Sequence, residues 1–108
     1  MIYLDYTANT PADPDVLDAY LAAERRYIAN PNSTHIAGQE ARAEMERVTQ
    51  SIAQHLGVQP AEIIYTSGAS EANNLALKGI AHASRHIGKH IISTPLEHSS
   101  VSGTLTAL

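Results

Sequence analysis

The sequence of 108 residues contains no cysteine, no phenylalanine and no tryptophan. The missing cysteine excludes disulfides, thiolate metal sites and a thiol nucleophile within these residues. The apolar 44% is also poor in large side chains, because 17 of its 47 residues are alanine, which removes little area from water when it is buried. We therefore expect the large aliphatic side chains to form any core almost alone.

Runs of like charge, long apolar stretches and a charged-then-apolar leader are also missing. The 7 basic and 11 acidic residues give a net charge of −4 that is spread along the chain, which argues against nucleic acid or an anionic membrane surface as a partner. No apolar stretch approaches the roughly 20 residues that cross a bilayer, and the first residues do not resemble a signal peptide. We expect a cytoplasmic protein with no nucleic-acid or membrane partner.

Two helices are predicted in the first half of the chain. Asp13 and Pro14 fit an N-cap followed by the first helical position, and apolar residues at helical spacing predict a helix over 14–28. A second apolar stripe of the same period predicts a long helix over 36–56. Gly57 follows its last apolar residue and is expected to end it.

Short strands alternate with helices in the second half. The run 62–66 is rich in β-branched and aromatic residues, and a glycine turn at 67–70 leads from it into a helix. The run 89–93 predicts a second buried strand, and a last helix opens near Glu97 and His98. This alternation predicts an α/β fold with an incomplete, mostly parallel sheet and flanking helices. Two strands leave open edges, so we expect the chain to be part of something larger.

The glycine turn is a candidate anion site. Such a turn at a helix start directs backbone N–H groups and the positive helix end outward, and the hydroxyls of Ser67 and Ser70 beside Gly68 could add hydrogen bonds. The alternative is that Ser70 only caps the helix, with Glu71 in the first turn. The segment has neither the Gly-Lys-Ser/Thr of a Walker loop nor the three glycines of a dinucleotide site.

Histidines supply the other candidates. His98, with Glu97, follows the second strand, so in a parallel sheet it would lie at the same edge as the glycine turn, where ligands bind. The alternative for His98 is a capping or packing role. His82, His86 and His90 are four residues apart, and the first two would share a helix face, as metal ligands can. No other ligand type is nearby in sequence, so we expect solvated histidines and no metal site.

Five segments then form an ordered series. They are 3–11 (Tyr-Leu-Asp-Tyr-Thr-Ala-Asn-Thr-Pro), 30–35 (Asn-Pro-Asn-Ser-Thr-His), 64–76 (Ile-Tyr-Thr-Ser-Gly-Ala-Ser-Glu-Ala-Asn-Asn-Leu-Ala), 88–92 (Gly-Lys-His-Ile-Ile) and Glu97-His98. Together they resemble the amino-terminal part of the cysteine desulfurases, class V aminotransferase-like enzymes that use pyridoxal phosphate (PLP). The second segment is similar to that family's Asn-Pro-Ser-Ser-x-His loop, and the third to its Thr-Ser-Gly-(Ala/Gly)-Thr-Glu-x-Asn-Asn block. The resemblance covers the whole chain.

This resemblance implies a fold and a cofactor site. The fold is part of a PLP-dependent transferase of the aspartate-aminotransferase type, with 1–12 belonging to the small domain and 13–108 forming the first part of the large PLP-binding domain. Ala69 and Ser70 would bind the cofactor phosphate through a backbone N–H and a hydroxyl, although relatives commonly have threonine at the position of Ser70. His98 would stack on the pyridine ring and help to move protons, which suits a flat side chain that titrates near neutrality.

The resemblance also indicates what these residues lack. In the family, the Schiff-base lysine, the aspartate that pairs with the pyridine nitrogen and the cysteine that takes up sulfur all come later in a chain of several hundred residues. Lys78 and Lys89 lie in the predicted helix and at the predicted strand start, so neither matches the lysine. Asn9 departs from the usual small or hydroxylic residue of the opening segment. Without the nucleophile and the electron-sink partner, we expect the isolated chain to be inert.

Several functional readings follow from the resemblance. The implied parent activity converts L-cysteine to L-alanine and leaves an enzyme persulfide, for iron–sulfur cluster or thio-cofactor synthesis. A sister reaction, that of a selenocysteine lyase or another class V aminotransferase, stays open, and so does a non-catalytic module that completes a partner's sheet. The parent is expected to be a homodimer with sulfur-acceptor or scaffold partners, and this chain to need a complementary carboxyl-terminal chain or self-association.

Overall fold

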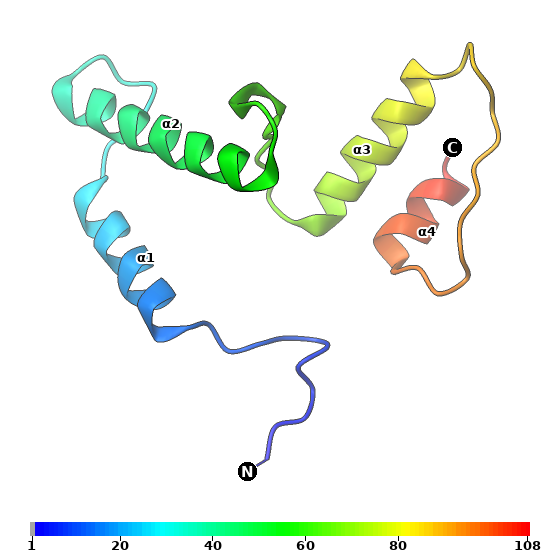
Figure 1. Ribbon diagram of the computed structural model, residues 1–108, viewed down its shortest axis with the longest axis horizontal. Helices are drawn as coiled ribbons and strands as arrows, with labels where there is room; N and C mark the ends of the chain where they lie inside the picture. The colour runs from blue at the N-terminus through cyan, green and yellow to red at the C-terminus, as the bar shows by residue number, and fades with distance from the viewer. Residues whose placement is uncertain (1) are drawn as a thin grey trace. The chain divides into compact units, whose positions relative to one another are not determined.

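The computed structural model describes residues 2–108 and contains two compact units, one ending at Ile63 and the other running from Ile64 to Leu108. Its helical elements, in chain order (Figure 1), are α1 (Pro14–Arg26), α2 (Ile36–Leu56), the short 3-10 helix η1 (Pro60–Glu62), α3 (Ala69–Ala83) and α4 (Ser99–Thr106). This division differs from the predicted boundary between residues 12 and 13. That boundary separates domains of a whole enzyme, so it stays a prediction.

Local sequence signals set the start of α1. Its N-cap is Asp13, whose Oδ1 accepts a hydrogen bond from the backbone N–H of Asp15 at 2.9 Å, and Pro14 occupies the first helical position. The helix ends at Arg26 rather than at Ile28. The predicted helix is therefore confirmed, with its last turn shorter than expected.

α2 has the predicted bounds. His35 is its N-cap, because the ring Nδ1 accepts a hydrogen bond from the backbone N–H of Gly38 at 3.2 Å. At the other end Gly57 has a φ of 68°, the left-handed conformation that glycine adopts without steric cost, and this ends the helix. Within the helix Ala41 and Ala53 are buried.

The loop between α1 and α2 is fastened to the first turns of α2. A Cβ at Gly38 would lie 2.6 Å from the carbonyl oxygen of Ser33 and 2.8 Å from that of Asn30, so a larger residue would force the loop away. Further along α2, Arg42 Nε donates a hydrogen bond to the carbonyl of Pro31 at 2.8 Å. The loop with the Asn-Pro-Asn-Ser-Thr-His sequence is thus held by close backbone approach and by one long side chain.

In the second unit, α3 and α4 lie side by side and run in the same direction (Figure 1). Near their starts Asn73 Nδ2 donates a hydrogen bond to Ser100 Oγ at 2.9 Å. Toward their ends Leu77 and Leu105 line one shared cavity. Because the two helices run in the same direction, the segment 84–98 returns from the end of α3 to the start of α4. A helix, a return segment and a second parallel helix form the path that a parallel α/β sheet requires.

The two predicted strands, over 62–66 and 89–93, are not formed within residues 2–108. η1 takes up the start of the first segment, and the second is an extended part of the return path (Figure 1). Strands are held by hydrogen bonds to a neighbouring strand, and neither segment pairs with the other or with any described residue. The sheet of the predicted α/β fold is therefore not formed by residues 2–108, because these two segments have no neighbouring strand to pair with.

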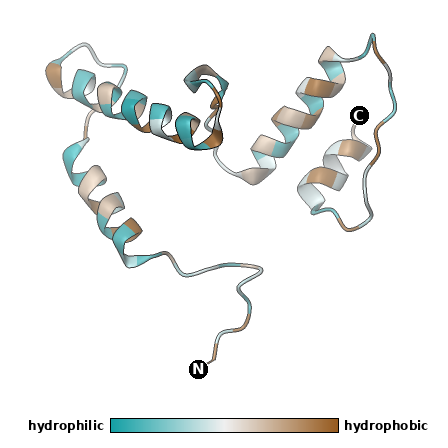
Figure 2. Ribbon diagram, viewed as in Figure 1, coloured by the Kyte–Doolittle hydropathy of each residue, from teal (hydrophilic) through white to brown (hydrophobic). Residues whose placement is uncertain are grey.

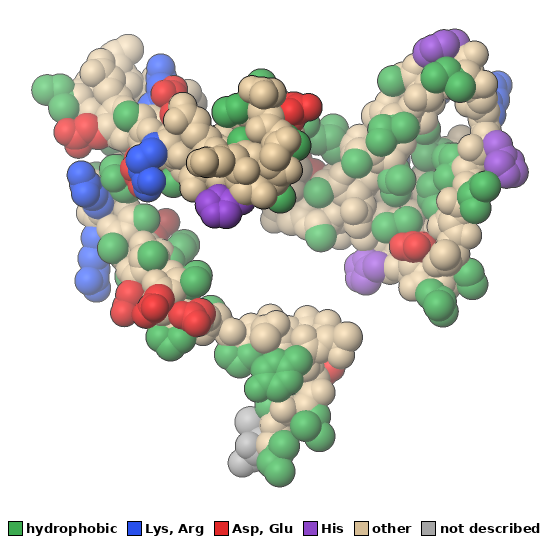
Figure 3. Space-filling view, viewed as in Figure 1, with side chains coloured by type: hydrophobic (Ala, Val, Ile, Leu, Met, Phe, Trp, Pro, Cys, Tyr) green, Lys and Arg blue, Asp and Glu red, His purple; other side chains and the backbone are tan. Residues whose placement is uncertain are grey.

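The described residues bury very little apolar area. Their buried hydrophobic residues are Ala41 and Ala53, while Ile92 is 89% and Leu96 93% exposed. Figure 2 shows hydrophobic residues on every helix, and Figure 3 shows hydrophobic side chains at the surface of both units. Large side chains were expected to form any core; that expectation is wrong for the described residues, because their buried apolar side chains are alanines. Each large aliphatic residue left in water forgoes roughly 1.5–3 kcal/mol of burial free energy.

Candidate functional site

α3 begins without a side-chain cap. Its N-cap is Gly68, and the N–H of Ala72 donates a hydrogen bond to the Gly68 carbonyl at 3.1 Å. The N–H groups of Ala69, Ser70 and Glu71 precede that bond, so they have no acceptor within the helix. A Cβ placed at Gly68 would meet no atom within 4 Å. The helix start is therefore accessible, with amide donors and the positive end of the helix dipole together.

The two serine hydroxyls at this turn have different surroundings. The Ser67 hydroxyl and backbone N–H both donate to Glu71 Oε2, each at 2.7 Å. Ser67 was expected to add a donor to an anion site; in the structure its hydroxyl serves the carboxylate instead. Ser70 is the second residue of α3 and not its cap, so the capping alternative for Ser70 is wrong. Within residues 2–108 no hydrogen-bond partner is present for the Ser70 hydroxyl, which leaves it as a donor for a ligand.

The Glu71 carboxylate accepts hydrogen bonds from the turn that precedes α3. Hydrogen bonds from Ser67, first from its hydroxyl and then from its backbone N–H, lower the pKa of the Glu71 carboxyl below its ordinary value. Glu71 is exposed, so solvent screens its negative charge. The carboxylate thus takes up the donors of Ser67 and leaves the first-turn amides of α3 for other acceptors.

His98 is the N-cap of α4. Its Nδ1 accepts a hydrogen bond from the backbone N–H of Ser100 at 3.2 Å and lies 2.9 Å from the Ser100 hydroxyl. The last helix therefore starts where it was predicted, and the capping role that was the alternative for His98 is present. The Nε2 atom makes no hydrogen bond to any residue that the structure describes, so the capping role leaves this atom for a ligand.

The structure brings Ser70 and His98 to the same end of the α3–α4 pair. Asn73 is one turn after Ser70 in α3, Ser100 is in the first turn of α4, and the two side chains are hydrogen-bonded. Asn73 and Ser100, which join the two helix starts, were not predicted from the sequence. The available signal was weak: a serine two residues after a histidine helix cap, and an amide one turn after the glycine turn.

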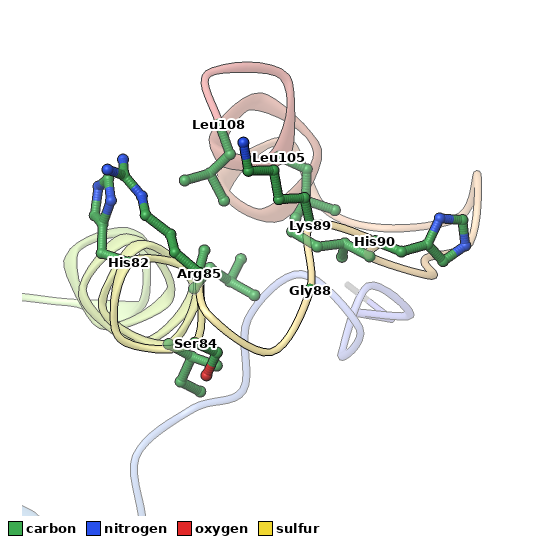
Figure 4. Close-up of a pocket in the computed structure, with 12 residues that line it drawn as sticks. His82, Ser84, Arg85, Gly88, Lys89, His90, Leu105 and Leu108 are labelled. Carbon is green, nitrogen blue, oxygen red and sulfur yellow. The ribbon is translucent and has the colours of Figure 1, made fainter.

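A cavity of about 850 Å³ lies elsewhere in this unit, toward the ends of α3 and α4. Neither Ser70 nor His98 lines it. Its walls come from α3, the return segment and α4, and the side chains labelled in Figure 4 include Leu105 and Leu108 on one side and Arg85 on another. Because neither of the residues selected from the sequence lines this cavity, we keep the helix starts as the candidate site.

The three evenly spaced histidines do not form a cluster. His86 lies beyond the last residue of α3, so it does not share a helix face with His82 as predicted. In Figure 4 His90 points away from His82. No group of three metal-ligating side chains occurs in the described part of the chain. Nor does that part contain a helix long and apolar enough to cross a membrane.

Comparison of the sequence with known protein families identifies the family of this chain. A family profile described as "Aminotransferase class-V" matches residues 2–108. The chain belongs to the class V aminotransferase family. The suspected resemblance is therefore confirmed over the whole sequence, including the glycine turn before α3 and the histidine that caps α4.

Individual class V relatives narrow the resemblance to one group. A human protein named cysteine desulfurase is 47% identical over 108 residues, which is 99% of this chain and 24% of that protein. A putative cysteine desulfurase NifS from Halalkalibacterium halodurans is 44% identical over 108 residues, 100% of this chain and 29% of that protein. The chain thus spans about a quarter of the length of the curated relatives that it matches.

A solved structure agrees with the sequence comparisons. A protein described as NifS-like matches 93% of this chain with a TM-score of 0.82 and 39% sequence identity, and the matched part is 28% of that protein. The chain therefore has part of the class V aminotransferase fold. Proteins of this family generally depend on PLP.

Proposed function

We propose that this chain forms the amino-terminal part of a PLP-dependent cysteine desulfurase, which converts L-cysteine to L-alanine and retains the sulfur as an enzyme persulfide. One observation carries the proposal. The uncapped start of α3 and the imidazole of His98 lie at one end of the α3–α4 pair, in a chain whose whole length aligns with cysteine desulfurases.

The residues present fit the phosphate and ring of PLP. A phosphate dianion needs several donors and a positive field, and the first-turn amides at Ala69 and Ser70, the unpartnered Ser70 hydroxyl and the helix dipole supply them. The open space at Gly68 leaves room for the group. The flat imidazole of His98 would lie against the pyridine ring, with Nε2 available to hold or move a proton. Bound PLP supplies an electron sink for bonds broken at the amino acid's α-carbon.

Catalysis on these residues alone is not expected. A persulfide needs a thiol, and the 108 residues contain no cysteine. Lys78 is in α3 and Lys89 is in the return segment, and we propose that neither binds the cofactor covalently. Incubation with PLP followed by borohydride reduction and peptide mapping tests this point. Specific labelling of either lysine would contradict it.

We further propose that the segments 63–66 and 89–93 become strands when the remaining part of the enzyme supplies their neighbours. Ile64 and Ile92 are 69% and 89% exposed, as expected of residues that a sheet and its covering helices would bury in the whole enzyme.

A homodimeric enzyme with sulfur-acceptor partners is part of the same proposal. We also propose that the enzyme is located in the cytoplasm. A relative from Drosophila melanogaster is named as mitochondrial, and cell fractionation would distinguish a cytoplasmic from a mitochondrial location.

The function is tested with a chimera in which this chain replaces the aligned segment of the Halalkalibacterium halodurans relative. We expect the purified chimera to bind PLP, to release alanine from L-cysteine and, with dithiothreitol present to reduce the persulfide, to release the sulfur as sulfide. His98→Gln should abolish sulfide release, while Thr106→Ala, a change in the last turn of α4 and away from the site, should leave it unchanged. A folded chimera that binds PLP and acts only on selenocysteine or on another amino acid would favour a sister class V reaction.

A non-catalytic module is the second candidate, and the unpaired segments 63–66 and 89–93 favour it. In that case the chain would complete the sheet of a partner desulfurase without contributing to its chemistry. Co-purification of the chain with such a partner, with sulfide release insensitive to His98→Gln in the chain, would support this function over the first.

A further inference from the structure

A hydrogen-bonded series of side chains links α3 to the start of α4. Asn73 Nδ2 donates to Ser100 Oγ at 2.9 Å, and Ser100 Oγ lies 2.9 Å from Nδ1 of His98. Asn73 and Ser100 are half-buried, whereas His98 is exposed. We propose that Asn73 and Ser100 are positioning residues, which hold the His98 ring in one orientation with its proton on Nε2.

Two donors of Ser100 favour one tautomer of the His98 ring. The Ser100 N–H, 3.2 Å from His98 Nδ1, can only donate, and the Ser100 hydroxyl, 2.9 Å from the same nitrogen, can donate to it as well. The two donors share the single lone pair of Nδ1. A neutral imidazole that accepts at Nδ1 has its hydrogen on Nε2.

Asn73 determines the direction of the Ser100 hydroxyl. Its Nδ2 carries only hydrogens, so Ser100 Oγ accepts from Asn73 with a lone pair and keeps its own hydrogen for His98. Each donor in the series therefore meets an acceptor. Because Asn73 is half-buried and 27 residues distant in sequence from Ser100, this bond also fixes α3 against α4 at the end that carries Ser70.

Other histidines of the chain provide an internal comparison. The Nδ1 of His55 lies 2.7 Å from the carbonyl oxygen of Ser51, which can only accept, so His55 carries its proton on Nδ1. The Nδ1 of His35 accepts from the Gly38 N–H, as His98 accepts from Ser100, but no hydroxyl of the described residues is hydrogen-bonded to it. The chain thus contains both tautomers, and His98 has the more constrained Nε2–H form.

The consequence for the site is a ring with a defined proton donor. With Nδ1 occupied, Nε2–H is the ring atom that can give a hydrogen bond or a proton to a group at the start of α3 and α4. Its use in catalysis rests on the function proposed above, whereas the orientation and the tautomer follow from the hydrogen bonds of this chain alone. Asn73 and Ser100 act through His98, so their role is positioning.

The tautomer can be measured by NMR in the 15N-labelled 108-residue chain at mildly alkaline pH, with His98→Gln used to assign the signal. We expect the two ring nitrogens of His98 to have clearly different 15N chemical shifts, with Nε2 protonated. His55 should show the opposite pattern, with Nδ1 protonated. Ser100→Ala should raise the Nδ1–H fraction of His98 several-fold, and Asn73→Leu should raise it less. Ser100→Thr, which keeps the hydroxyl, should restore the wild-type pattern.

The control is Thr106→Ala, which removes a hydroxyl from the last turn of α4, where it donates to the Ser102 carbonyl and does not contact His98. This control should leave the tautomer ratios of both His98 and His55 unchanged. The proposal is overturned by a His98 tautomer ratio equal to that in urea-denatured chain, or by one that Ser100→Ala does not change.

This measurement separates the inference from the proposed function. If the tautomer responds as expected but the chimera releases no sulfide, the positioning series stands and the desulfurase proposal fails. If both hold, Ser100→Ala in the chimera should lower kcat about tenfold with little change in KM. An unchanged kcat would overturn the catalytic use of the positioning series.

Discussion

The starts of α3 and α4 lie at the same end of the second unit, but only α4 has a side-chain cap. α4 has a side-chain cap, the Nδ1 of His98, which accepts the Ser100 N–H. α3 begins at Gly68 with no side-chain cap, although Ser67 and Ser70 flank it. A capped start uses its first amides within the protein, whereas an uncapped start leaves them for a ligand.

The difference separates two roles in one site. At α3 the backbone supplies donors and a positive field, which suit a phosphate. At α4 the same kind of helix start is used to orient an imidazole, because the amide that would otherwise face solvent holds Nδ1. The predictions below alter each start in turn.

The largest effect is expected from giving α3 a cap. In Gly68→Asp the new side chain enters open space, and the backbone at φ 166° is extended, as any residue can adopt. The carboxylate would accept first-turn N–H groups and repel a phosphate, so PLP affinity of the chimera should fall by about tenfold or more, or ~1.4 kcal/mol.

Titration with PLP measures this effect, and Gly68→Ala is the matched control because it adds a Cβ without an acceptor. Gly68→Ala should bind PLP as the parent chimera does. Equal affinity of Gly68→Asp and Gly68→Ala would show that the open start of α3 is not the phosphate site.

Removing the cap of α4 should have an intermediate effect. His98→Ala should lower the stability of the second unit by about 1 kcal/mol, because an N-cap acceptor is lost. His98→Asn, which can still accept the Ser100 N–H, should retain most of that stability. Urea denaturation of the chain followed by circular dichroism gives the comparison, and in the chimera both variants should lose sulfide release. Equal stability of the two variants would argue that the cap contributes nothing.

The smallest effect concerns the carboxylate beside α3. The pKa of Glu71 is lowered in the folded chain by its hydrogen bonds from Ser67. Folding therefore gains from the ionised form. That gain is complete above the ordinary pKa of 4.5 and is lost as the pH falls through the lowered folded value. Helicity at acidic pH should fall in the wild type and fall less in Glu71→Gln. A Glu71 carboxyl that titrates at its ordinary value by 13C NMR would contradict this.

The sequence predicted features that depend on neighbouring residues and missed those that depend on distant ones. Asp13-Pro14 predicted the correct start of α1, and Gly57 the correct end of α2, because caps and left-handed glycines act within one turn. The segments 62–66 and 89–93 were predicted as strands from their composition, but a strand needs a hydrogen-bonded neighbour, and residues 2–108 provide none.

In the candidate site too, residues within a motif were predicted from the sequence and a contact between distant residues was not. Ser70 and His98 were selected by motif, and their roles in cofactor binding stay predictions. Ser67 was also selected, but a carboxylate four residues away competes for its hydroxyl. The link between Asn73 and Ser100 could not be read from residues 27 apart in sequence, because only the packing of α3 on α4 brings the two side chains within hydrogen-bond distance.

By itself, the sequence determined the family, the long helices and the glycine turn, since each is written in contiguous residues. Only the tertiary structure decided that Asn73 is hydrogen-bonded to Ser100 and that both helix starts share one end. These outcomes depend on the packing of α3 against α4, which brings together groups that are 27 residues apart in the sequence.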